Sequence, residues 1–477
     1  MIAQIPASIS NDKPLRIAIA QIAKDQTDLF AYEAKRHDAF SRARAEGADF
    51  AAIGGESGLV EDERVTIVTD VSLFNGSMQA TLERLSRRAV ETGKPVVLAG
   101  TSGVNDGGKA IRPFNGLSGV FSIDGAFHPV LQRFEEGFAT IDLDDASIAA
   151  LPAAPVAETF NDKARALRFG LHAFMARLGI KRVVIGVSGG IDSAVASALY
   201  SSFLPPEDIL LIAMPGPFTS QTTRRLAREL ATGLATRFAE IPIGEAVELT
   251  CRQFAELRSE GPGGGVQGAW ELSPFAVENV QARDRGSRVL AAATSAFNGV
   301  ASCNANKAEA TVGYGTLHGD IFGWLSCLGD LWKGEVYQLG RFLNNEIFRR
   351  DVIPEGIFTI KPSAELSEAQ AVDQGLGDPL DYPWHDKLFR AWVEEDYTPE
   401  DCHRFFADGS IASRIGYEGD PAALFPTIDA FDADMRRWWG LFRGLSVAKR
   451  LQAPPTLAVS KRAFGEFPEI QRGASKS

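Results

Sequence analysis

The stretch Val184-Ile185-Gly186-Val187-Ser188-Gly189-Gly190-Ile191-Asp192-Ser193-Ala194 carries the features of a strand, a glycine turn and a helix start. The run Arg182–Ile185 has the length and the β-branched content of a buried strand. After the turn, apolar residues recur on one stripe, which predicts a helix through Phe203. We therefore expect free N–H groups and the positive end of a helix dipole to converge on one point, an arrangement that suits phosphate.

The residue types in this turn favour the same interpretation. Gly189 and Gly190 allow the backbone to come close to a ligand, and Ser188 and Ser193 can add hydroxyl donors. Asp192 can hold a metal ion against the same phosphates. The Walker pattern is absent, because no Gly-Lys pair is followed by Ser or Thr. A turn that needs glycine for its geometry alone is the alternative, but Ser-Gly-Gly-x-Asp-Ser at a strand end favours a phosphate site.

Composition limits the class of protein. The chain has 477 residues, which suggests two or three domains, and its hydrophobic content of 45% is that of a globular protein. A net charge of −12 argues against nucleic acid or an anionic membrane as the main partner. We see no signal peptide and no run of the ~18 apolar residues that a membrane span needs, so we expect a cytoplasmic protein. Neither a disulfide framework nor a zinc site is indicated, because the cysteines are dispersed at Cys251, Cys303, Cys327 and Cys402.

The first part of the chain begins with alternating strands and helices and finishes with antiparallel strands. The Asp124-Gly125 pair predicts a hairpin turn. The expected strands are Leu15–Gln21, Phe50–Ile53, Pro95–Ala99, Gly116–Ile123, Val130–Arg133 and Ala139–Leu143, and the expected helices are Leu29–Glu46 and Met78–Thr92.

This order resembles the nitrilase-like glutaminase domain that precedes many bacterial NAD synthetases. Arg16–Gln21 looks like the first strand of that domain, and Ala48–Ser57 lies where the family has a characteristic strand end. The resemblance places Glu56 on the catalytic glutamate of a Glu-Lys-Cys triad.

The rest of that triad is missing. The segment Asn115–Gly125 runs directly into Phe134–Asp144, which resembles the end of the family's domain, so the block that normally carries lysine and cysteine is absent. The first cysteine of the chain is Cys251. Because such an amidase needs a thiolate nucleophile, we expect a truncated, degenerate domain without glutaminase activity, in which Glu56 is vestigial.

A proline-rich stretch at 149–158 reads as a linker between a first domain at 1–148 and a second at 159–477. In the second part, helices and strands alternate, which predicts an α/β fold with a doubly wound parallel sheet and a binding site at the carboxyl ends of its strands. The expected elements are a helix at Thr159–Leu178, a strand at Ile209–Ala213, a helix at Ser220–Leu234, a strand at Arg237–Ile241 and a helix at Glu245–Leu257.

Two further constellations suggest ligands. Asn279 and Arg283 lie four residues apart on one helix face, with Arg285 on or near the same face. This fits either a grip on the phosphates or ribose of a dinucleotide or a solvated polar face. Glu309 follows the short strand Val300–Ser302 and is a plausible second carboxylate for Mg²⁺ beside Asp192, although an ordinary helix residue is the alternative.

From about Thr159 to Phe467 the chain resembles NAD synthetase, an ATP pyrophosphatase that adenylates a carboxylate. The resemblance implies that catalysis depends on Asp192, Glu309 and Lys333, and that Asp192 and Glu309 bind Mg²⁺. ATP would contact Ser188, Gly189, Gly190, Asp192, Ser193, Asn304, Lys333 and Ser363. Deamido-NAD would contact Asn279, Arg283, Tyr314, Thr316, Leu317 and Lys449. The colinear blocks that carry the resemblance are 188–193, 214–220, 278–285, 306–309, 313–320, 330–339, 361–366 and 449–455.

Two departures leave the substrate open. Asn304 stands where the family has an ATP-contacting threonine, and Gln374–Asp386 is longer than the family's segment. The sequence thus predicts ATP- and Mg²⁺-dependent amidation of deamido-NAD with ammonia, or amidation of a different carboxylate by the same machinery, or an inactive regulatory relative. We expect a homodimer or larger homo-oligomer, and a separate glutaminase as a possible partner.

Overall fold

The computed structural model describes residues 1–5, 13–24, 28–76, 78–155, 157–263, 266–268 and 270–466. They form two compact units. The first comprises Met1–Gly107, Ile111–Phe174 and Ala458–Lys461, and the second comprises Gly108–Ala110, Met175–Leu457 and the residues from Arg462 on. The predicted boundary at 149–158 differs from this division, because the first unit continues to Phe174.

The first unit contains two mixed sheets. The strand order of one is β1 (Ile2–Gln4), β3 (Phe50–Ile53), β2 (Arg16–Gln21) and β11 (Gly137–Asp142). The order of the other is β10 (Phe127–Pro129), β9 (Gly119–Phe121), β6 (Val96–Ala99), β5 (Thr66–Thr69) and β4 (Gly58–Glu61). The pairs β2–β3 and β5–β6 are parallel and the other neighbours are antiparallel.

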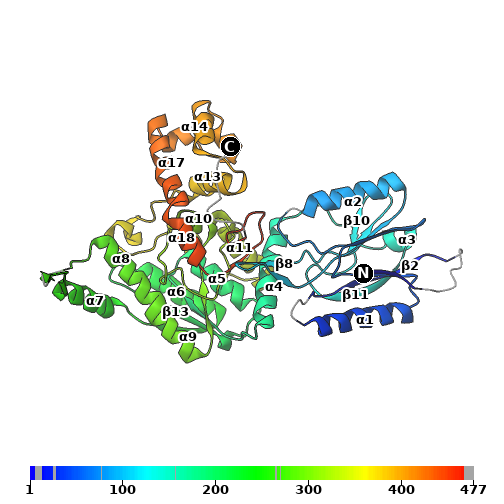
Figure 1. Ribbon diagram of the computed structural model, residues 1–477, viewed down its shortest axis with the longest axis horizontal. Helices are drawn as coiled ribbons and strands as arrows, with labels where there is room; N and C mark the ends of the chain where they lie inside the picture. The colour runs from blue at the N-terminus through cyan, green and yellow to red at the C-terminus, as the bar shows by residue number, and fades with distance from the viewer. Residues whose placement is uncertain are drawn as a thin grey trace. The chain divides into compact units, whose positions relative to one another are not determined.

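These sheets form the middle of four layers. Alternate residues of each strand point to opposite faces, and Ile17 and Phe50 of one sheet share a core with Val97 of the other. The opposite face of the first sheet packs on α1 (Leu29–Ala45), and that of the second packs on α2 (Met78–Thr92). In Figure 1, α1 and α2 accordingly lie on opposite sides of the strands.

Most of the predicted elements of this unit are present. The hairpin turn is confirmed: β9 and β10 pair around Gly125, which has φ +87°. The strand predicted at Val130–Arg133 is wrong, since the strand is Phe127–Pro129. The Arg133 guanidinium instead forms hydrogen bonds to Asn115 and Glu158, which hold this segment as a loop.

The second unit is built on parallel strands, which confirms the predicted doubly wound α/β fold. Their order is β14 (Arg237–Glu240), β13 (Ile209–Ala213), β12 (Val183–Gly186), β17 (Val300–Cys303), β18 (Leu325–Ser326) and β19 (Thr456–Leu457). The chain proceeds outward from β12 in one direction and from β17 in the other. The switch point between β12 and β17 is where such sheets bind ligands.

Helices cover both faces of this sheet. On one face, Val184 and Ile212 pack against α7 (Gly244–Glu256) and the helical segment 284–290. The alternate residues Val183 and Leu211 are fully buried on the other face, where α5 (Ile191–Ser201) and α6 (Gln221–Leu234) contact the strands.

A helical bundle follows the sheet and supports one of the candidate site residues. It includes α13 (Tyr382–Glu394), α14 (Pro399–Ala407), α17 (Ile428–Arg443) and α18 (Leu445–Gln452). Its core is aromatic and includes Trp384, Trp392 and Trp438. The short helix α10 (Lys307–Val312) contributes Ala308 and Val312 to the same core, so the bundle fixes the helix that carries Glu309.

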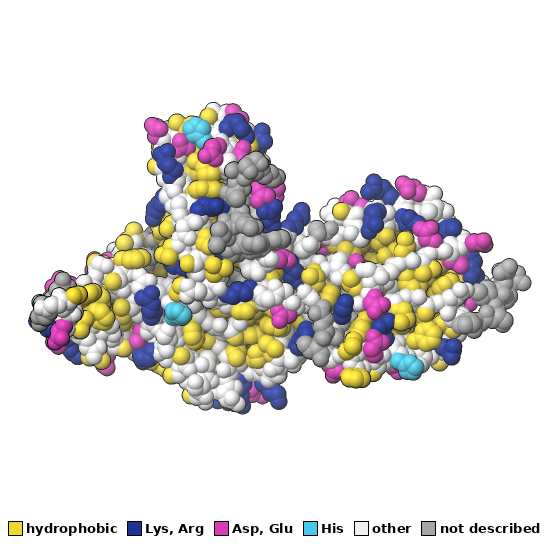
Figure 2. All heavy atoms as spheres, viewed as in Figure 1, with side chains coloured by type: hydrophobic (Ala, Val, Ile, Leu, Met, Phe, Trp, Pro, Cys, Tyr) yellow, Lys and Arg dark blue, Asp and Glu magenta, His cyan; other side chains and the backbone are white. Residues whose placement is uncertain are grey.

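The charged side chains on the surface reflect the mixture of basic and acidic residues in the sequence. Figure 2 shows basic and acidic side chains interspersed over the face in view. Of the helices in the described ranges, none combines the length and the apolar character that crossing a bilayer requires.

The core of the first unit provides a stability prediction. Leu85 of α2 is 3% exposed within a well-packed cluster, whereas Leu59 of β4 is 58% exposed. We expect Leu85→Ala to lower the free energy of unfolding by about 2–5 kcal/mol because it leaves a cavity. Leu59→Ala should change it by less than about 0.5 kcal/mol. Urea denaturation followed by circular dichroism measures both, and equal effects would contradict the assigned packing.

Candidate active site

The loop between β12 and α5 is shaped by glycine. Gly189 has φ +86°, and a Cβ atom at this position would lie 2.2 Å from the carbonyl oxygen of Thr223. Only glycine therefore fits. The Ser188 N–H donates to Ser193 Oγ at 3.2 Å, and the Gly190 N–H donates to Ser188 Oγ at 3.2 Å. Both hydroxyls thus lie at the N-terminus of α5, where backbone donors attract an anion.

A buried cation lies beside this loop. Lys333, the first residue of α11 (Lys333–Phe342), is 3% exposed. Its Nζ atom donates to Asp192 Oδ2 at 2.6 Å and to Glu309 Oε1 at 3.5 Å. Burial alone would lower the pKa of Lys333, but the two carboxylates raise it above its ordinary value. Burial and the Asp192 charge raise the pKa of Glu309 to about 8. The lysine therefore stays charged and lies between the two acidic side chains, of which Asp192 is the closer.

The helix α10 is oriented by its own cap. The Asn306 N–H donates to Glu309 Oε2 at 3.2 Å, and the Glu309 N–H donates to Asn306 Oδ1 at 3.1 Å, which together form a capping box. Asn306 Nδ2 also donates to Asp192 Oδ1 at 3.0 Å. Beneath them, buried Lys307 forms ion pairs with Asp330 at 2.9 Å and Glu394 at 3.0 Å.

The two carboxylates suit a magnesium ion. Asp192 and Glu309 come from different helices and converge next to the anion loop, and Mg²⁺ bridging phosphates uses one or two protein carboxylates. Throughout the described residues, no group of three or more His, Cys, Asp or Glu residues is placed to hold a metal. A magnesium ion here would therefore complete its coordination with phosphate oxygens and water.

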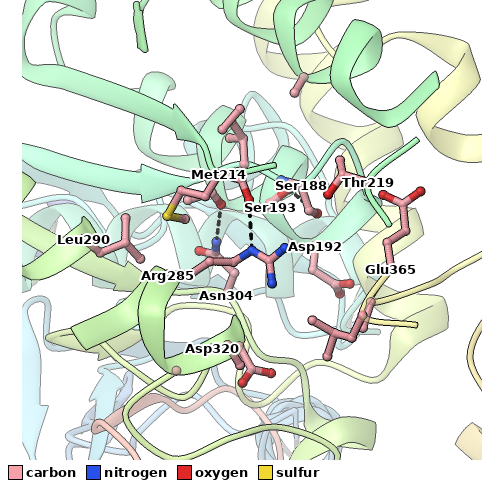
Figure 3. Close-up of a pocket in the computed structure, with 18 of the residues that line it drawn as sticks. Ser188, Asp192, Ser193, Met214, Thr219, Arg285, Leu290, Asn304, Asp320 and Glu365 are labelled. Carbon is pink, nitrogen blue, oxygen red and sulfur yellow. Dashed lines mark hydrogen bonds between the residues drawn. The ribbon is translucent and has the colours of Figure 1, made fainter. Parts of the chain in front are cut away.

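A cavity of about 250 Å³ opens at the carboxyl ends of β12, β13 and β17 (Figure 3). One wall is apolar and includes Met214 and Leu290, and the opposite side carries Ser188, Ser193 and Asp192. A second cavity of about 110 Å³ shares Ser188, Asp192 and Glu309 and adds Lys333 and Asp378. The base and the polyphosphate chain of one nucleotide could thus lie in different cavities.

The remaining predicted ATP contacts also line the large cavity. Asn304 Nδ2 donates to the Gly186 carbonyl at 3.1 Å, and its Oδ1 accepts from Ser302 Oγ at 2.9 Å. Ser363 Oγ donates to the Gln370 carbonyl at 2.6 Å. Both side chains form hydrogen bonds within the protein in this structure. Their contacts with ATP stay predictions.

Most of the predicted deamido-NAD contacts gather around residues 313–316. Thr316 Oγ1 donates to Asn279 Oδ1 at 2.9 Å, and the Tyr314 hydroxyl donates to Asp378 at 3.0 Å. Lys449 Nζ donates to the Gly313 and Gly315 carbonyls at 2.6 and 2.5 Å.

Two others lie at the margin of this group. Arg283 is exposed, and Leu317 is partly buried in a bridge with Ile321.

Glu56 lies in the first unit, and its side chain is 55% exposed. It faces Arg36 Nη1 at 3.4 Å. No cysteine is near it in the sequence, since none precedes Cys251.

Two cavity residues, Glu365 and Asp378, were not singled out by sequence reasoning, and Arg285 was placed only on or near the ligand-facing side of its helix. Glu365 has φ +49°, and its carboxylate accepts from the Ser220 N–H at 3.2 Å and the Thr223 hydroxyl at 2.7 Å. Asp378 accepts from Tyr314 and lies in the predicted divergent stretch. Arg285 lies centrally in the large cavity. For Asp378, the sequence signal was its place in the divergent stretch Gln374–Asp386.

The second unit is a doubly wound α/β fold with a glycine loop at its switch point, and Asp192 and Glu309 lie beside that loop. Residues 164–412 match the NAD synthase family. The chain belongs to this family.

Its relatives include two glutamine-dependent NAD(+) synthetases. The protein from Synechocystis sp. is 31% identical over 366 residues, covering 77% of this chain and 56% of the relative. The protein from Rhodobacter capsulatus is 30% identical over 357 residues, covering 71% and 60%. This chain therefore spans less than two thirds of the length of either relative.

Solved structures show the same fold. A glutamine-dependent NAD+ synthetase from Acinetobacter baumannii, in complex with ADP, aligns with a TM-score of 0.54 at 21% identity, covering 96% of this chain and 73% of that one. One from Cytophaga hutchinsonii aligns with a TM-score of 0.62 at 14% identity, covering 89% and 74%.

The anion loop gives a direct prediction for ATP binding. Gly189→Val introduces a Cβ atom against the Thr223 carbonyl at a positive φ, a strain of about 1–3 kcal/mol. We expect ATP affinity to fall about tenfold or more. Gly244→Ala is the control, because a Cβ there meets nothing within 4 Å. Calorimetric titration with ATP measures both, and unchanged affinity of Gly189→Val would exclude this loop as the phosphate site.

Proposed function

We propose that this protein converts deamido-NAD to NAD, using ATP to activate the nicotinate carboxylate and free ammonia to form the amide. The observation that carries the proposal is the Ser188–Ser193 loop with Asp192, Glu309 and Lys333 beside it, in a chain of the NAD synthase family.

The reaction has two steps. A carboxylate oxygen of deamido-NAD attacks the α-phosphorus of ATP, and the bond to the bridging oxygen breaks, so that pyrophosphate leaves. Ammonia then attacks the acyl carbon, AMP departs with the carboxylate oxygen, and the nitrogen loses a proton to give the amide.

The residues of the site fit the demands of the first step. The N–H groups and hydroxyls of the loop bind the pyrophosphate oxygens, whose negative charge increases as the bond breaks. The ammonium of Lys333 lies beside Asp192 and Glu309, where it contributes positive charge to the same place. Mg²⁺, held by Asp192 and Glu309, would supply further neutralisation of the triphosphate. Bound substrates that fill the cavity would displace water, which would otherwise hydrolyse the acyl adenylate.

The nitrogen source follows from the first unit. The relatives are named glutamine-dependent, but residues 1–250 of this chain contain no cysteine. An amidase of the nitrilase type forms its thioester on a cysteine thiolate. We therefore infer that the first unit is a degenerate glutaminase domain that serves as scaffold, and that ammonia reaches the synthetase site from outside this chain. Supply by a separate glutaminase, and assembly into a homodimer, stay part of this proposal.

A different carboxylate substrate is the second candidate. Asn304 replaces a threonine that the resemblance places against ATP, and Asp378, from the divergent stretch, lies in the smaller cavity. Measuring pyrophosphate release with deamido-NAD and with other carboxylic acids separates the candidates: the acid with the highest kcat/KM is the substrate. An inactive relative is disfavoured because the carboxylate pair and Lys333 are all present.

The synthetase reaction should depend on Asp192 and not on Glu56. We expect Asp192→Asn to reduce ammonium-dependent NAD formation about a hundredfold or more, because it removes the negative charge of one of the two acidic side chains that would bind Mg²⁺. Glu56→Gln is the control and should leave the rate unchanged, since its side chain is largely exposed in the other unit. NAD formation is followed enzymatically, and an active Asp192→Asn variant would refute the assigned site.

The donor is tested on the pure protein in ammonia-free buffer. We expect NAD formation with ammonium chloride and none above background with glutamine. Efficient turnover with glutamine would contradict the claim that the first unit is inactive as a glutaminase. It would leave the synthetase assignment unchanged.

A further inference from the structure

Arg285 occupies an unusual position for a charged side chain. It follows α8 (Pro274–Arg283) within the π-helical segment Asp284–Leu290. Such segments are frequent at functional sites because they change the direction of side chains. Arg283 is exposed, whereas Arg285 lies inside the large cavity (Figure 3).

The segment is held in place by a close contact. Gly286 packs against the Gly319 carbonyl oxygen, and a Cβ atom at this position would lie 2.2 Å from that oxygen. The path of the backbone next to Arg285 is therefore fixed by packing.

The guanidinium group of Arg285 uses only part of its hydrogen-bonding capacity. Its Nε atom donates to the Met214 carbonyl at 3.0 Å. Within the described residues this is its one hydrogen bond, and no carboxylate there forms an ion pair with it. Glu365, a neighbour across the cavity, directs its carboxylate to Ser220 and Thr223 at the start of α6. The two terminal nitrogens of Arg285 thus have donors available to a ligand.

Partial burial of the guanidinium group favours an anion at this position. It lowers the pKa of Arg285 to about 10, and the charges of Asp320, Asp284 and Glu365 offset the effect only in part. The group still carries its charge at neutral pH. The side chain is partly buried and its terminal nitrogens face the cavity, so an anionic ligand there can accept charge-assisted hydrogen bonds from them.

The position of Arg285 in the cavity indicates which anion would fit beside it. Figure 3 places Arg285 between the apolar wall at Met214 and Leu290 and the anion loop at Ser188 and Asp192. A nucleotide with its base on that wall and its terminal phosphates on that loop has its α-phosphate between them. The attacking carboxylate must reach the same phosphorus.

We propose that Arg285 is a catalytic residue that binds the α-phosphate of ATP and the carboxylate that attacks it. The inference rests on the proposed function. As the carboxylate oxygen bonds to phosphorus and pyrophosphate departs with its electron pair, two anions are brought together. Arg285 stays protonated and donates hydrogen bonds to both, which lowers their repulsion in the transition state.

The kinetic test uses three variants of the full chain. Arg285→Met should lower kcat for deamido-NAD-dependent pyrophosphate release about a hundredfold or more, and it should also raise the KM for ATP about tenfold, because the contact with the α-phosphate already exists in the ground state. Arg285→Lys should recover part of the loss, since it keeps the charge but not the fork of donors. Arg288→Met is the matched control on the same segment and should behave as wild type, because Arg288 is exposed and pairs with Asp284.

A binding test needs no turnover and separates the two proposals. By calorimetry, Arg285→Met should weaken AMP binding about tenfold or more and leave adenosine binding unchanged. Equal weakening of both ligands, or of neither, overturns the role of Arg285. If wild-type protein binds AMP as described but releases no pyrophosphate with deamido-NAD, the proposed function fails while the α-phosphate contact stands. Equal melting temperatures of wild type and Arg285→Lys exclude loss of folding as the cause.

Discussion

The ion triad of Lys333 with Asp192 and Glu309 is the interaction on which the rest of the site depends. Two carboxylates at 2.6 and 3.5 Å from one buried ammonium would repel each other without it. The triad joins the first turns of three helices, α5, α10 and α11, whose residues lie far apart along the chain. Because these helices start near the carboxyl ends of the parallel strands, the sheet topology sets the position of the triad.

Packing behind the site keeps these helix starts in register. Lys307, next to the capping box of α10, is fully buried and paired with Asp330 and Glu394. Glu394 ends α13, so the aromatic bundle and the catalytic helix share an ion pair as well as a core. Removing one partner of such a pair leaves an uncompensated charge. The bundle thus has a direct energetic link to the orientation of Glu309, although none of its helices supplies a metal-binding carboxylate.

Local patterns sufficed to predict the parallel sheet and the glycine loop, because strand periodicity and the glycine turn are local properties. The pairing of Glu309 with Asp192 depended on the family resemblance, because by its local pattern alone Glu309 could equally be an ordinary helix residue. The sequence placed Arg285 on or near the face of Arg283, but local patterns did not predict that it lies deeper in the cavity than Arg283. Regular α-helical spacing put Arg283 on the ligand-facing side, and the π-helical turn from Asp284 brings Arg285 into the cavity instead. Glu365 was equally hidden, since its positive φ arises from tertiary contacts with α6. The strand expected at 130–133 failed for a similar reason: Arg133 is committed to tertiary hydrogen bonds.

The two units differ in the residues that they offer for chemistry. The second unit carries Asp192, Glu309 and Lys333, whereas the first has four packed layers and no cysteine. The central claim is that the amide nitrogen comes from free ammonia. Its most direct test supplies ¹⁵N-labelled ammonium together with an excess of unlabelled glutamine and determines the label in the product by mass spectrometry. The account predicts that the carboxamide of NAD carries the label, and an unlabelled carboxamide would contradict it.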